Sequence, residues 1–559
     1  MRRGLTPRGR GRYNRRVTIH RARALLWAIP ALAVLSFAGQ RHALWGTDEP
    51  REAEIAREMY ASGEWVVPRL NGEPFLEKPP LAHLGAVLVF HAAGGPTEEW
   101  CRLPSAAWGL AGLLATAWLG AMLAGPGAGL LSAFILATSV EWIHITRYLL
   151  VDVPLASCVI ISLACFWAGH TRRGPARALG YIGAACAAGG AFMAKGTVGI
   201  AIPLSAVGAY LIPRRRWREF ALACCAFAAG GAAATLPWMA MLAARGGSPA
   251  IKVFLWDNQV LRFFSPRADH SGPPWFYIVR IFELFLPWAF LLPPALLALA
   301  RPGAETETER GRRHFLLAAI IAPFALLSAA SGKRHLYLLP LLPAFAIATA
   351  RWAGGEWPGG RRRWEIIWMR VCAAALAMAA VAAWCAALVA AFRARSGSAA
   401  AAASLAAAAA AVWVLSRVRP RGGGAGDGWR MAAYAALAWS AALSPAVWGT
   451  IDAAKGYAPL TEMLDSNILP GDVLHAYIPD ERELGVVGFH RRVSIPVIGS
   501  VEALDELLRG PGGNAVLMRE KAYDELAGRG ELPASAAVAA RCVLPHRNQV
   551  LLRASRPAR

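Results

Sequence analysis

Charged residues are scarce in this 559-residue chain: they make up 17% of it, against about 25% in an average soluble protein. Hydrophobic residues make up 56%. A disordered chain needs a much larger polar fraction, and so does an array of soluble domains. The composition therefore excludes disorder, disfavours several soluble domains and indicates a polytopic membrane protein.

Acidic residues are the scarcer of the two charge types, with 36 Asp and Glu against 59 Lys and Arg and a net charge of +23. A nucleic-acid-binding protein concentrates its basic residues on one solvated face. Here the arginines form short clusters between apolar runs, as at Arg214–Arg216, Arg361–Arg363 and from Arg417 to Arg430. Such clusters are typical of cytoplasmic loops, so the charge indicates topology and no nucleic-acid partner is expected.

Cysteine pairs and nucleotide-binding glycine motifs are also lacking. The nine cysteines include no CxxC motif. Eight of them lie in or beside apolar runs, and only Cys542 lies in the polar C-terminal part. We therefore predict neither a disulfide framework nor a thiolate zinc site. Because there is no P-loop or other glycine-rich phosphate motif, we expect no nucleotide cofactor.

The apolar runs predict many membrane spans. Residues 1–23 hold nine arginines and no acid, so we interpret them as a basic cytoplasmic tail before an uncleaved anchor rather than a signal peptide or a nucleic-acid arm. At about 20 residues per span, the candidates are 24–40, 81–94, 104–123, 128–147, 154–170, 178–194, 197–213, 219–242, 277–300, 314–331, 335–350, 366–391, 398–416 and 430–449. Segment 81–94 is short; without it, about 13 transmembrane helices remain, and Asp48 and Asp152 lie on the same outer side.

The fold class expected is mainly α, with a small α/β domain at the C-terminus. We predict a transmembrane domain over 24–450, whose first outer loop is 41–80, and an extracytoplasmic α/β domain over 451–559. Within the loop, Glu49–Tyr60 is interpreted as an amphipathic helix with Ile55 and Met59 on its apolar side. Short β-rich runs at 472–478, 493–498, 515–518 and 550–552 predict the strands of the domain.

Charged residues beside apolar spans are costly and are functional candidates by default. Asp48 and Arg51 have the i, i+3 spacing of a helical ion pair, although Asp48 could instead be a simple helix cap. Lys78 stands before two prolines at headgroup level, where it could bind a lipid phosphate or simply pair with Glu77. Asp152 precedes Pro154 and could complement a helix dipole. The remaining outer candidates are Lys195, the segment 262–277 with Asp269 and His270, and the segment 331–337.

Two motifs in the first outer loop resemble a known family. Asp-Glu-Pro-Arg-Glu-Ala-Glu-Ile-Ala-Arg-Glu-Met begins at Asp48, and Asn-Gly-Glu-Pro-Phe-Leu-Glu-Lys-Pro-Pro-Leu begins at Asn71. They resemble the bacterial aminoarabinose transferases that modify lipid A and, more widely, the protein O-mannosyltransferase superfamily of C-type glycosyltransferases. The resemblance extends over roughly 24–350, through Leu-Val-Asp-Val-Pro-Leu, Ala-Lys-Gly and Gly-Lys-Arg-His-Leu-Tyr-Leu-Leu-Pro. It departs from the family pattern at Glu52 and Leu76, where the family usually has aromatic residues.

The resemblance implies an inverting glycosyltransferase that moves a sugar from a polyprenyl-phosphate donor to a lipid A-like lipid, a glycan or a protein on the outer face of the bacterial inner membrane. The N-terminus would be cytoplasmic. The implied site residues, by role, are: catalytic, Asp48, Arg51 and Asp152; substrate-binding, Glu49, Lys78, Lys195, Lys333, Arg334 and Tyr337; metal-binding, Glu77 and His270, for zinc or magnesium.

The chemistry of these residue types agrees with the implied roles. A departing polyprenyl phosphate is anionic, so lysine and arginine side chains would stabilise the charge that develops on it. An aspartate can act as a general base toward a hydroxyl acceptor, or merely orient an acceptor that is already a phosphate.

A transporter or lipid flippase is the alternative function. It predicts charges at mid-membrane and repeated broken helices. The sequence instead places its acids at loop edges and has no visible internal repeat.

Overall fold

The computed structural model describes residues 29–261, 272–301, 303, 305–354, 362–393, 426–442, 451–452, 455–510, 513–544 and 547–554. The basic tail at 1–23, the predicted span 398–416 and the candidates Asp269 and His270 lie outside these residues. The chain forms two compact units. The membrane unit is Met1–Gly39, Ser105–Arg147 and Val151–Val447, and the loop unit is Gln40–Pro104, Tyr148–Leu150 and Trp448–Arg559.

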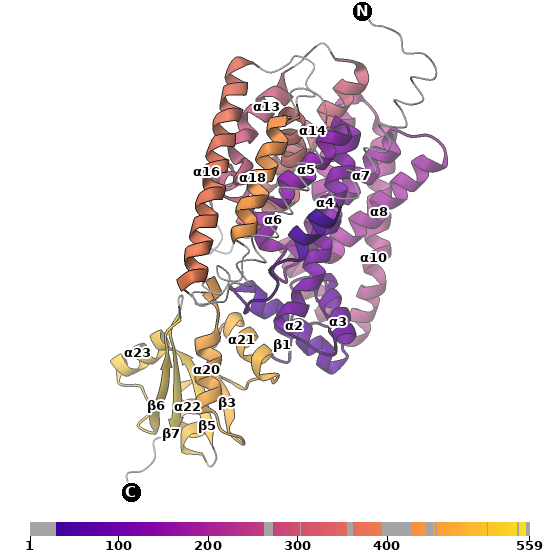
Figure 1. Ribbon diagram of the computed structural model, residues 1–559. Coiled ribbons are helices and arrows are strands. Elements are labelled where there is room, and N and C mark those ends of the chain that lie inside the picture. The colour runs from indigo at the N-terminus through magenta and orange to yellow at the C-terminus, as the bar shows by residue number, and fades with distance from the viewer. Residues whose placement is uncertain are drawn as a thin grey trace, which may run out of the picture. The chain divides into compact units, whose positions relative to one another are not determined.

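The regular elements of the membrane unit are all helices in its described residues (Figure 1). Its elements are the main part of α4 (Glu98–Ala124), α5 (Pro126–Ala137), α6 (Val140–Ile145), α7 (Asp152–His170), α8 (Pro175–Lys195), α9 (Val198–Leu211), η1 (Ile212–Arg214), α10 (Trp217–Lys252), η2 (Val253–Leu261), α12 (Phe276–Leu284), η4 (Trp288–Leu291), α13 (Leu292–Ala300), α14 (Glu307–Ala329), η5 (His335–Leu341), α15 (Leu342–Ala353), α16 (Arg363–Arg393) and α18 (Gly426–Ala442). Helices α7, α8 and α10 pack side by side, as do α16 and α18.

Six helices in the described residues are long and apolar enough to cross a membrane, or seven if one bent pair is a single span. The bent pair, Phe276–Leu284 and Trp288–Ala300, turns by 119° where the sequence predicts one continuous span over 277–300. Pro287 lies at the break, and proline removes a backbone donor and disrupts a helix interior. The predicted span 128–147 is also divided, into α5 and α6. The number of about 13 crossings stays a prediction.

The loop unit combines the first loop with the C-terminal segment. Its elements are α2 (Asp48–Ser62), β1 (Arg69–Leu70), β2 (Glu73–Pro74), α3 (Leu81–Ala93), the start of α4, α20 (Ala458–Asn467), β3 (Val473–Tyr477), α21 (Glu481–Arg491), β4 (Val497–Ile498), α22 (Val501–Arg509), β5 (Asn514–Arg519), α23 (Glu520–Arg529), β6 (Ala536–Cys542) and β7 (Gln549–Ala554). The sequence predicts the first loop as part of the transmembrane domain, whereas the loop folds into one compact unit with the C-terminal segment.

The C-terminal segment folds as a five-stranded mixed sheet with the order β4-β3-β5-β7-β6. Strands β4, β3 and β5 are parallel, and β7 is antiparallel to both β5 and β6. Side chains alternate between the two faces, so that Leu517 packs with α20 and α21 while Val516 packs with α22 and α23. The α/β domain expected from the sequence is therefore a three-layer structure with helices on both faces.

The β-rich runs predict this sheet only in part. Strands β3, β5 and β7 fall where the sequence indicates them, while the run 493–498 contributes only Val497–Ile498. The sequence does not predict strand β6, because the segment Ala-Ala-Val-Ala-Ala-Arg-Cys has few of the β-branched and aromatic residues that mark a strand.

Candidate active site

Helix α2 positions the first group of predicted site residues. Asp48 is its first residue, Thr47 occupies the cap position, and Gly63 ends the helix in the left-handed conformation with φ 68°. Since Asp48 follows the cap position, it is not simply an N-cap. The predicted pair is confirmed: Arg51 Nη2 lies 3.1 Å from Asp48 Oδ1 across one helical turn. Asp48 keeps 23% of its side chain exposed, whereas the Arg51 side chain is 8% exposed.

The amphipathic interpretation of this helix is wrong. Ile55 and Met59 are buried as predicted, but so are the acidic and basic residues from Glu49 to Glu58. Their burial is compensated by ion pairs, as between Glu54 and Arg57 at 2.6 Å. Helix α2 is therefore an internal element of the loop unit and not a surface helix with one solvated face.

Glu49 is an anchor of the loop in this structure, where the sequence predicts a substrate contact. Its Oε1 accepts from Arg102 Nε at 2.6 Å, and its Oε2 accepts from the backbone N–H of Trp45 at 2.8 Å. Arg102 also donates to the carbonyl oxygens of Gln40, His42 and Ala43. Both carboxylate oxygens of Glu49 thus already accept hydrogen bonds within the protein, and the Glu49–Arg102 pair is fully buried.

Glu52 is the centre of the group. Its carboxylate lies 2.7 Å from Arg51 Nη2, 2.7 Å from Lys78 Nζ and 2.7 Å from His83 Nε2. Lys78 comes from the Glu-Lys-Pro-Pro segment and His83 from α3. Burial of Glu52 opposes its charge, but Lys78 and Arg51 outweigh that cost and hold the pKa of Glu52 well below its usual value of 4.5. Glu52 is therefore ionised at neutral pH and lies between two cations.

Arg51 joins this group to the C-terminal domain. Its Nη1 donates to Glu481 Oε2 at 2.7 Å, while its Nη2 contacts Asp48 and Glu52. Burial opposes the charge of Arg51, but the carboxylates of Glu52 and Asp48 raise its pKa above the usual 12.5. One guanidinium thus contacts three acids, one of them from another part of the loop unit.

The sequence does not predict Glu52 or His83 as site residues, although a signal for His83 is present. An imidazole in the apolar segment Leu-Ala-His-Leu-Gly-Ala-Val-Leu-Val carries the same cost as any polar group in a buried helix. His83 is fully buried, and its Nδ1 makes no hydrogen bond within the described residues.

A second group lies within the membrane unit. Asp152, in the first turn of α7, forms an ion pair with Lys195, the last residue of α8. Lys195 Nζ also lies over the ring of Tyr337, 4.6 Å from its centroid. Three residues that the sequence predicts separately are thus brought together. Lys333 is close in sequence to Tyr337 alone of these three, and its Nζ donates to the Ala330 carbonyl at 3.0 Å.

The predicted metal site is only partly within the described residues. Glu77 is half-buried in the first loop, and His270 lies outside the described residues. Among the residues that are described, no group of three or more His, Cys, Asp or Glu side chains is arranged to hold a metal ion. Glu77 alone is an insufficient donor set for zinc or magnesium, so no reaction step is assigned to a metal.

Comparisons with known proteins agree with this fold. Residues 43–247 match the family model for dolichyl-phosphate-mannose-protein mannosyltransferase. The chain is 32% identical over 299 residues to the undecaprenyl phosphate-alpha-4-amino-4-deoxy-L-arabinose arabinosyl transferase of Edwardsiella ictaluri, with 51% of each chain covered. It is 33% identical over 312 residues to the corresponding transferase 2 of Sodalis glossinidius, covering 55% of this chain and 53% of the relative. The chain thus spans about half the length of the curated relatives it matches.

The likeness in structure covers more of the chain. The crystal structure of ArnT from Cupriavidus metallidurans bound to undecaprenyl phosphate superposes with a TM-score of 0.69 at 22% identity, covering 96% of this chain and 97% of that one. The apo structure of the same protein gives 0.68. The chain therefore has the fold of this ArnT structure.

Proposed function

We propose that this protein transfers a sugar, with inversion, from a polyprenyl-phosphate carrier to an envelope acceptor at the outer face of the bacterial inner membrane. The observation that carries the proposal is the contrast among the acids of α2. The side chains of Glu49, Glu52 and Glu54 are at most 1% exposed, whereas that of Asp48 is 23% exposed and is held by a buried arginine. Asp48 is the carboxylate of this group that an acceptor can reach.

The reaction breaks the bond between the anomeric carbon and the phosphate oxygen and forms a bond from that carbon to an acceptor oxygen. Polyprenyl phosphate leaves with the electron pair of the broken bond. If the acceptor is a hydroxyl, its proton passes to Asp48, which acts as general base. If the acceptor is a phosphate, Asp48 orients it and no proton is transferred.

Cationic side chains stabilise the departing phosphate in this scheme. Lys78 is the candidate in the first loop, and Lys333 and Arg334 are the candidates in the membrane unit. Lys78 is held in place by Glu52 at 2.7 Å, so it is oriented before the donor binds. A cation that is already in position needs little reorganisation when charge develops on the leaving group.

The proposed donor follows from the named relatives, and the proposed acceptors follow from the resemblance of the first-loop motifs. Those of Edwardsiella ictaluri and Sodalis glossinidius are named for transfer of 4-amino-4-deoxy-L-arabinose from undecaprenyl phosphate. We propose the same class of carrier, with a lipid A-like lipid as acceptor and a glycan or protein as the other acceptor classes. The N-terminus would be cytoplasmic, and the C-terminal α/β domain would be extracytoplasmic, on the side of the first outer loop.

Mass spectrometry of envelope lipids and glycoproteins, from cells with and without the protein, tests this function directly. We expect one component to gain the mass of a sugar residue only when the protein is present. The purified protein in liposomes, given undecaprenyl-phosphate-linked aminoarabinose and lipid A, should yield the same product and free undecaprenyl phosphate. An unchanged envelope together with an inactive purified protein would refute the proposal.

A further inference from the structure

We propose that the C-terminal domain is a working part of the active site, in which Glu481 of α21 acts as a positioning residue for Arg51 and Asp48. The inference rests on the proposed function for its kinetic test. It adds a role for a domain whose function is otherwise unassigned. All the contacts that carry it lie within the loop unit.

The first step of the argument is the packing of α21 on α2. Glu481, Gly485 and Gly488 are spaced i, i+4 and i+7 and therefore lie along one stripe of α21. An added Cβ at Gly485 would lie 2.6 Å from the backbone of Pro50 and Arg51. An added Cβ at Gly488 would lie 2.4 Å from Glu54 Oε1. At Gly485 the two helices thus approach so closely that only glycine fits, and a side chain at Gly488 would displace the Glu54 carboxylate.

The second step is the direction of Glu481 at the end of that stripe. Its carboxylate reaches Arg51 Nη1 at 2.7 Å while Arg51 Nη2 contacts Asp48 and Glu52. The planar guanidinium has a fixed fork of donors. An acid bound at one branch therefore limits the orientation of the branch that faces Asp48.

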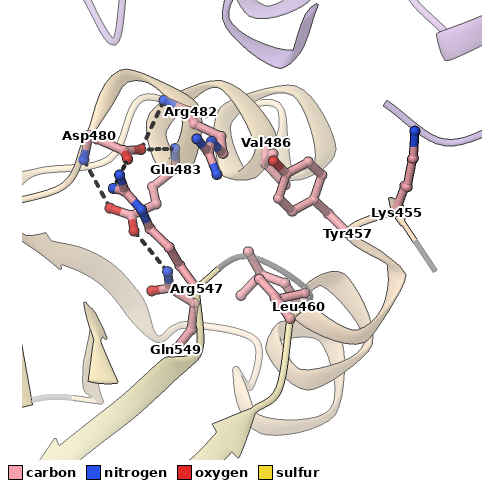
Figure 2. Close-up of a pocket in the computed structure, with 10 residues that line it drawn as sticks. Lys455, Tyr457, Leu460, Asp480, Arg482, Glu483, Val486, Arg547 and Gln549 are labelled. Carbon is pink, nitrogen blue, oxygen red and sulfur yellow. Dashed lines mark hydrogen bonds and ion pairs between the residues drawn. The ribbon is translucent and has the colours of Figure 1, made fainter. Parts of the chain in front are cut away.

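The third step is how α21 itself is held, and Figure 2 shows contacts at the pocket that its Arg482, Glu483 and Val486 line. Asp480 caps the helix by accepting from the backbone N–H groups of Arg482 and Glu483 at 3.1 and 3.0 Å. Arg547 Nη1 lies 2.5 Å from Asp480, and Gln549 of β7 donates to Glu483 at 2.8 Å. The N-terminal turn that carries Glu481 is therefore fixed to the sheet.

Further contacts attach the loop to the same domain. Asn71 and Ile495 exchange two hydrogen bonds, from Asn71 Nδ2 to the Ile495 carbonyl at 2.8 Å and from the Ile495 N–H to Asn71 Oδ1 at 2.6 Å. The Tyr457 hydroxyl donates to the Gly46 carbonyl at 2.7 Å, two residues before Asp48. Asp452 accepts from the Ala43 N–H and from Trp45 Nε1. The domain thus holds both ends of the segment that carries Asp48.

The kinetic test compares matched pairs of variants in the full-length protein in liposomes. Gly485→Ala is paired with Gly528→Ala, since Gly528 has open space around it. Glu481→Gln is paired with Glu506→Gln, since Glu506 is exposed on α22. The added methyl group of Gly485→Ala should push α2 away and displace Asp48. We expect kcat to fall at least about tenfold, because a displacement of a catalytic group by up to about 1 Å has an effect of this size. Glu481→Gln, which removes a half-exposed ion pair, should lower kcat about threefold with the donor KM unchanged.

A double-mutant cycle separates positioning from general stability. If Glu481 acts through Arg51, then Glu481→Gln should have no further effect on the residual activity of Arg51→Lys. A merely structural role would instead multiply the two losses. The same variants are examined by hydrogen exchange, where Gly485→Ala should expose the α2 amides over 48–62 and Gly528→Ala should not.

The outcomes distinguish this inference from the proposed function. If the wild type transfers no sugar, the proposed function fails, and hydrogen exchange still decides whether α21 holds α2. If the wild type is active and Gly485→Ala and Glu481→Gln behave like their controls, the positioning role is overturned. Multiplicative losses in the double mutant would also overturn it.

Discussion

Glu52 of α2 and His83 of α3 meet in the interior of the loop unit, with 2.7 Å between Oε2 and Nε2. They stand 31 residues apart in the sequence, and the same carboxylate also receives Arg51 and Lys78. Because an ionised carboxylate only accepts hydrogen bonds, His83 Nε2 must be the donor. This contact fixes α3 to the helix that carries Asp48.

Glu52→Gln should destabilise the loop unit. The substitution removes the negative charge that lies between the Arg51 and Lys78 cations, and breaking a buried ion pair costs about 3 kcal/mol or more. We expect a lower thermal unfolding midpoint in detergent, with Glu73→Gln on exposed β2 as the control. Equal midpoints for the two variants would contradict the central role of Glu52.

The loss of stability in Glu52→Gln should depend on pH, because the pKa of Glu52 is lowered in the folded protein. A carboxyl with a depressed folded-state pKa contributes stability above its unfolded value of 4.5 and loses it as the pH falls toward the folded value. The difference in thermal unfolding midpoint between wild type and Glu52→Gln should therefore be constant from about pH 5.5 to 8 and should shrink in stronger acid. A gap that closes already between pH 7 and 6 would mean that another group is responsible.

Asp48→Asn should abolish transfer while membrane abundance is unchanged. The amide keeps the shape and the exposed position but cannot accept a proton, and loss of a general base costs about 10²- to 10⁴-fold in rate. Transfer is measured with the liposome assay, and Asp524→Asn, at an exposed position of α23, is the control. Full activity of Asp48→Asn would remove Asp48 from the catalytic role.

Asp152 and Lys195 should behave as a coupled pair. Lys195→Met leaves a buried uncompensated carboxylate, so we expect a marked fall in membrane abundance. Adding Asp152→Asn should restore the abundance, because no net charge is then left in the pair. If the pair takes part in transfer, the double variant is abundant but inactive; restored activity would assign the two residues a structural role only.

Metal binding by Glu77 and His270 remains a prediction that can be checked without an activity assay. Glu77→Gln and His270→Ala should each lower the divalent metal bound to the purified protein, measured by elemental mass spectrometry. His490→Ala in α21 controls for the loss of an imidazole elsewhere. Unchanged metal in both site variants would refute the metal site.

Local patterns in the sequence predict the parts of the site that depend on neighbouring residues. The Asp48 to Arg51 spacing indicates an ion pair, and the structure has it at 3.1 Å. Apolar runs predict the helices of the membrane unit, but not the break at Pro287 or the division of 128–147. The helix over 49–60 is predicted in the right place, but the burial of its charged residues is not predicted.

Long-range contacts cannot be predicted in the same way. Burial of Glu49 depends on Arg102, 53 residues later, and the partner of Arg51 in the C-terminal domain is 430 residues away. Neither spacing leaves a periodic pattern. Gly485 and Gly488 give no signal of their own, because a glycine required by a neighbouring helix is indistinguishable in sequence from a flexible one.

The hairpin at Asn71-Gly72 contacts the C-terminal domain, and this contact limits how domains can be exchanged between related proteins. Both residues have positive φ, 55° and 82°, as a tight two-residue turn between β1 and β2 requires. The Asn71 side chain also makes the two reciprocal bonds to Ile495. A chimaera that receives only a foreign C-terminal domain would keep a loop shaped for its former partner. Residues 40–104 and the C-terminal domain should therefore be transplanted as one module.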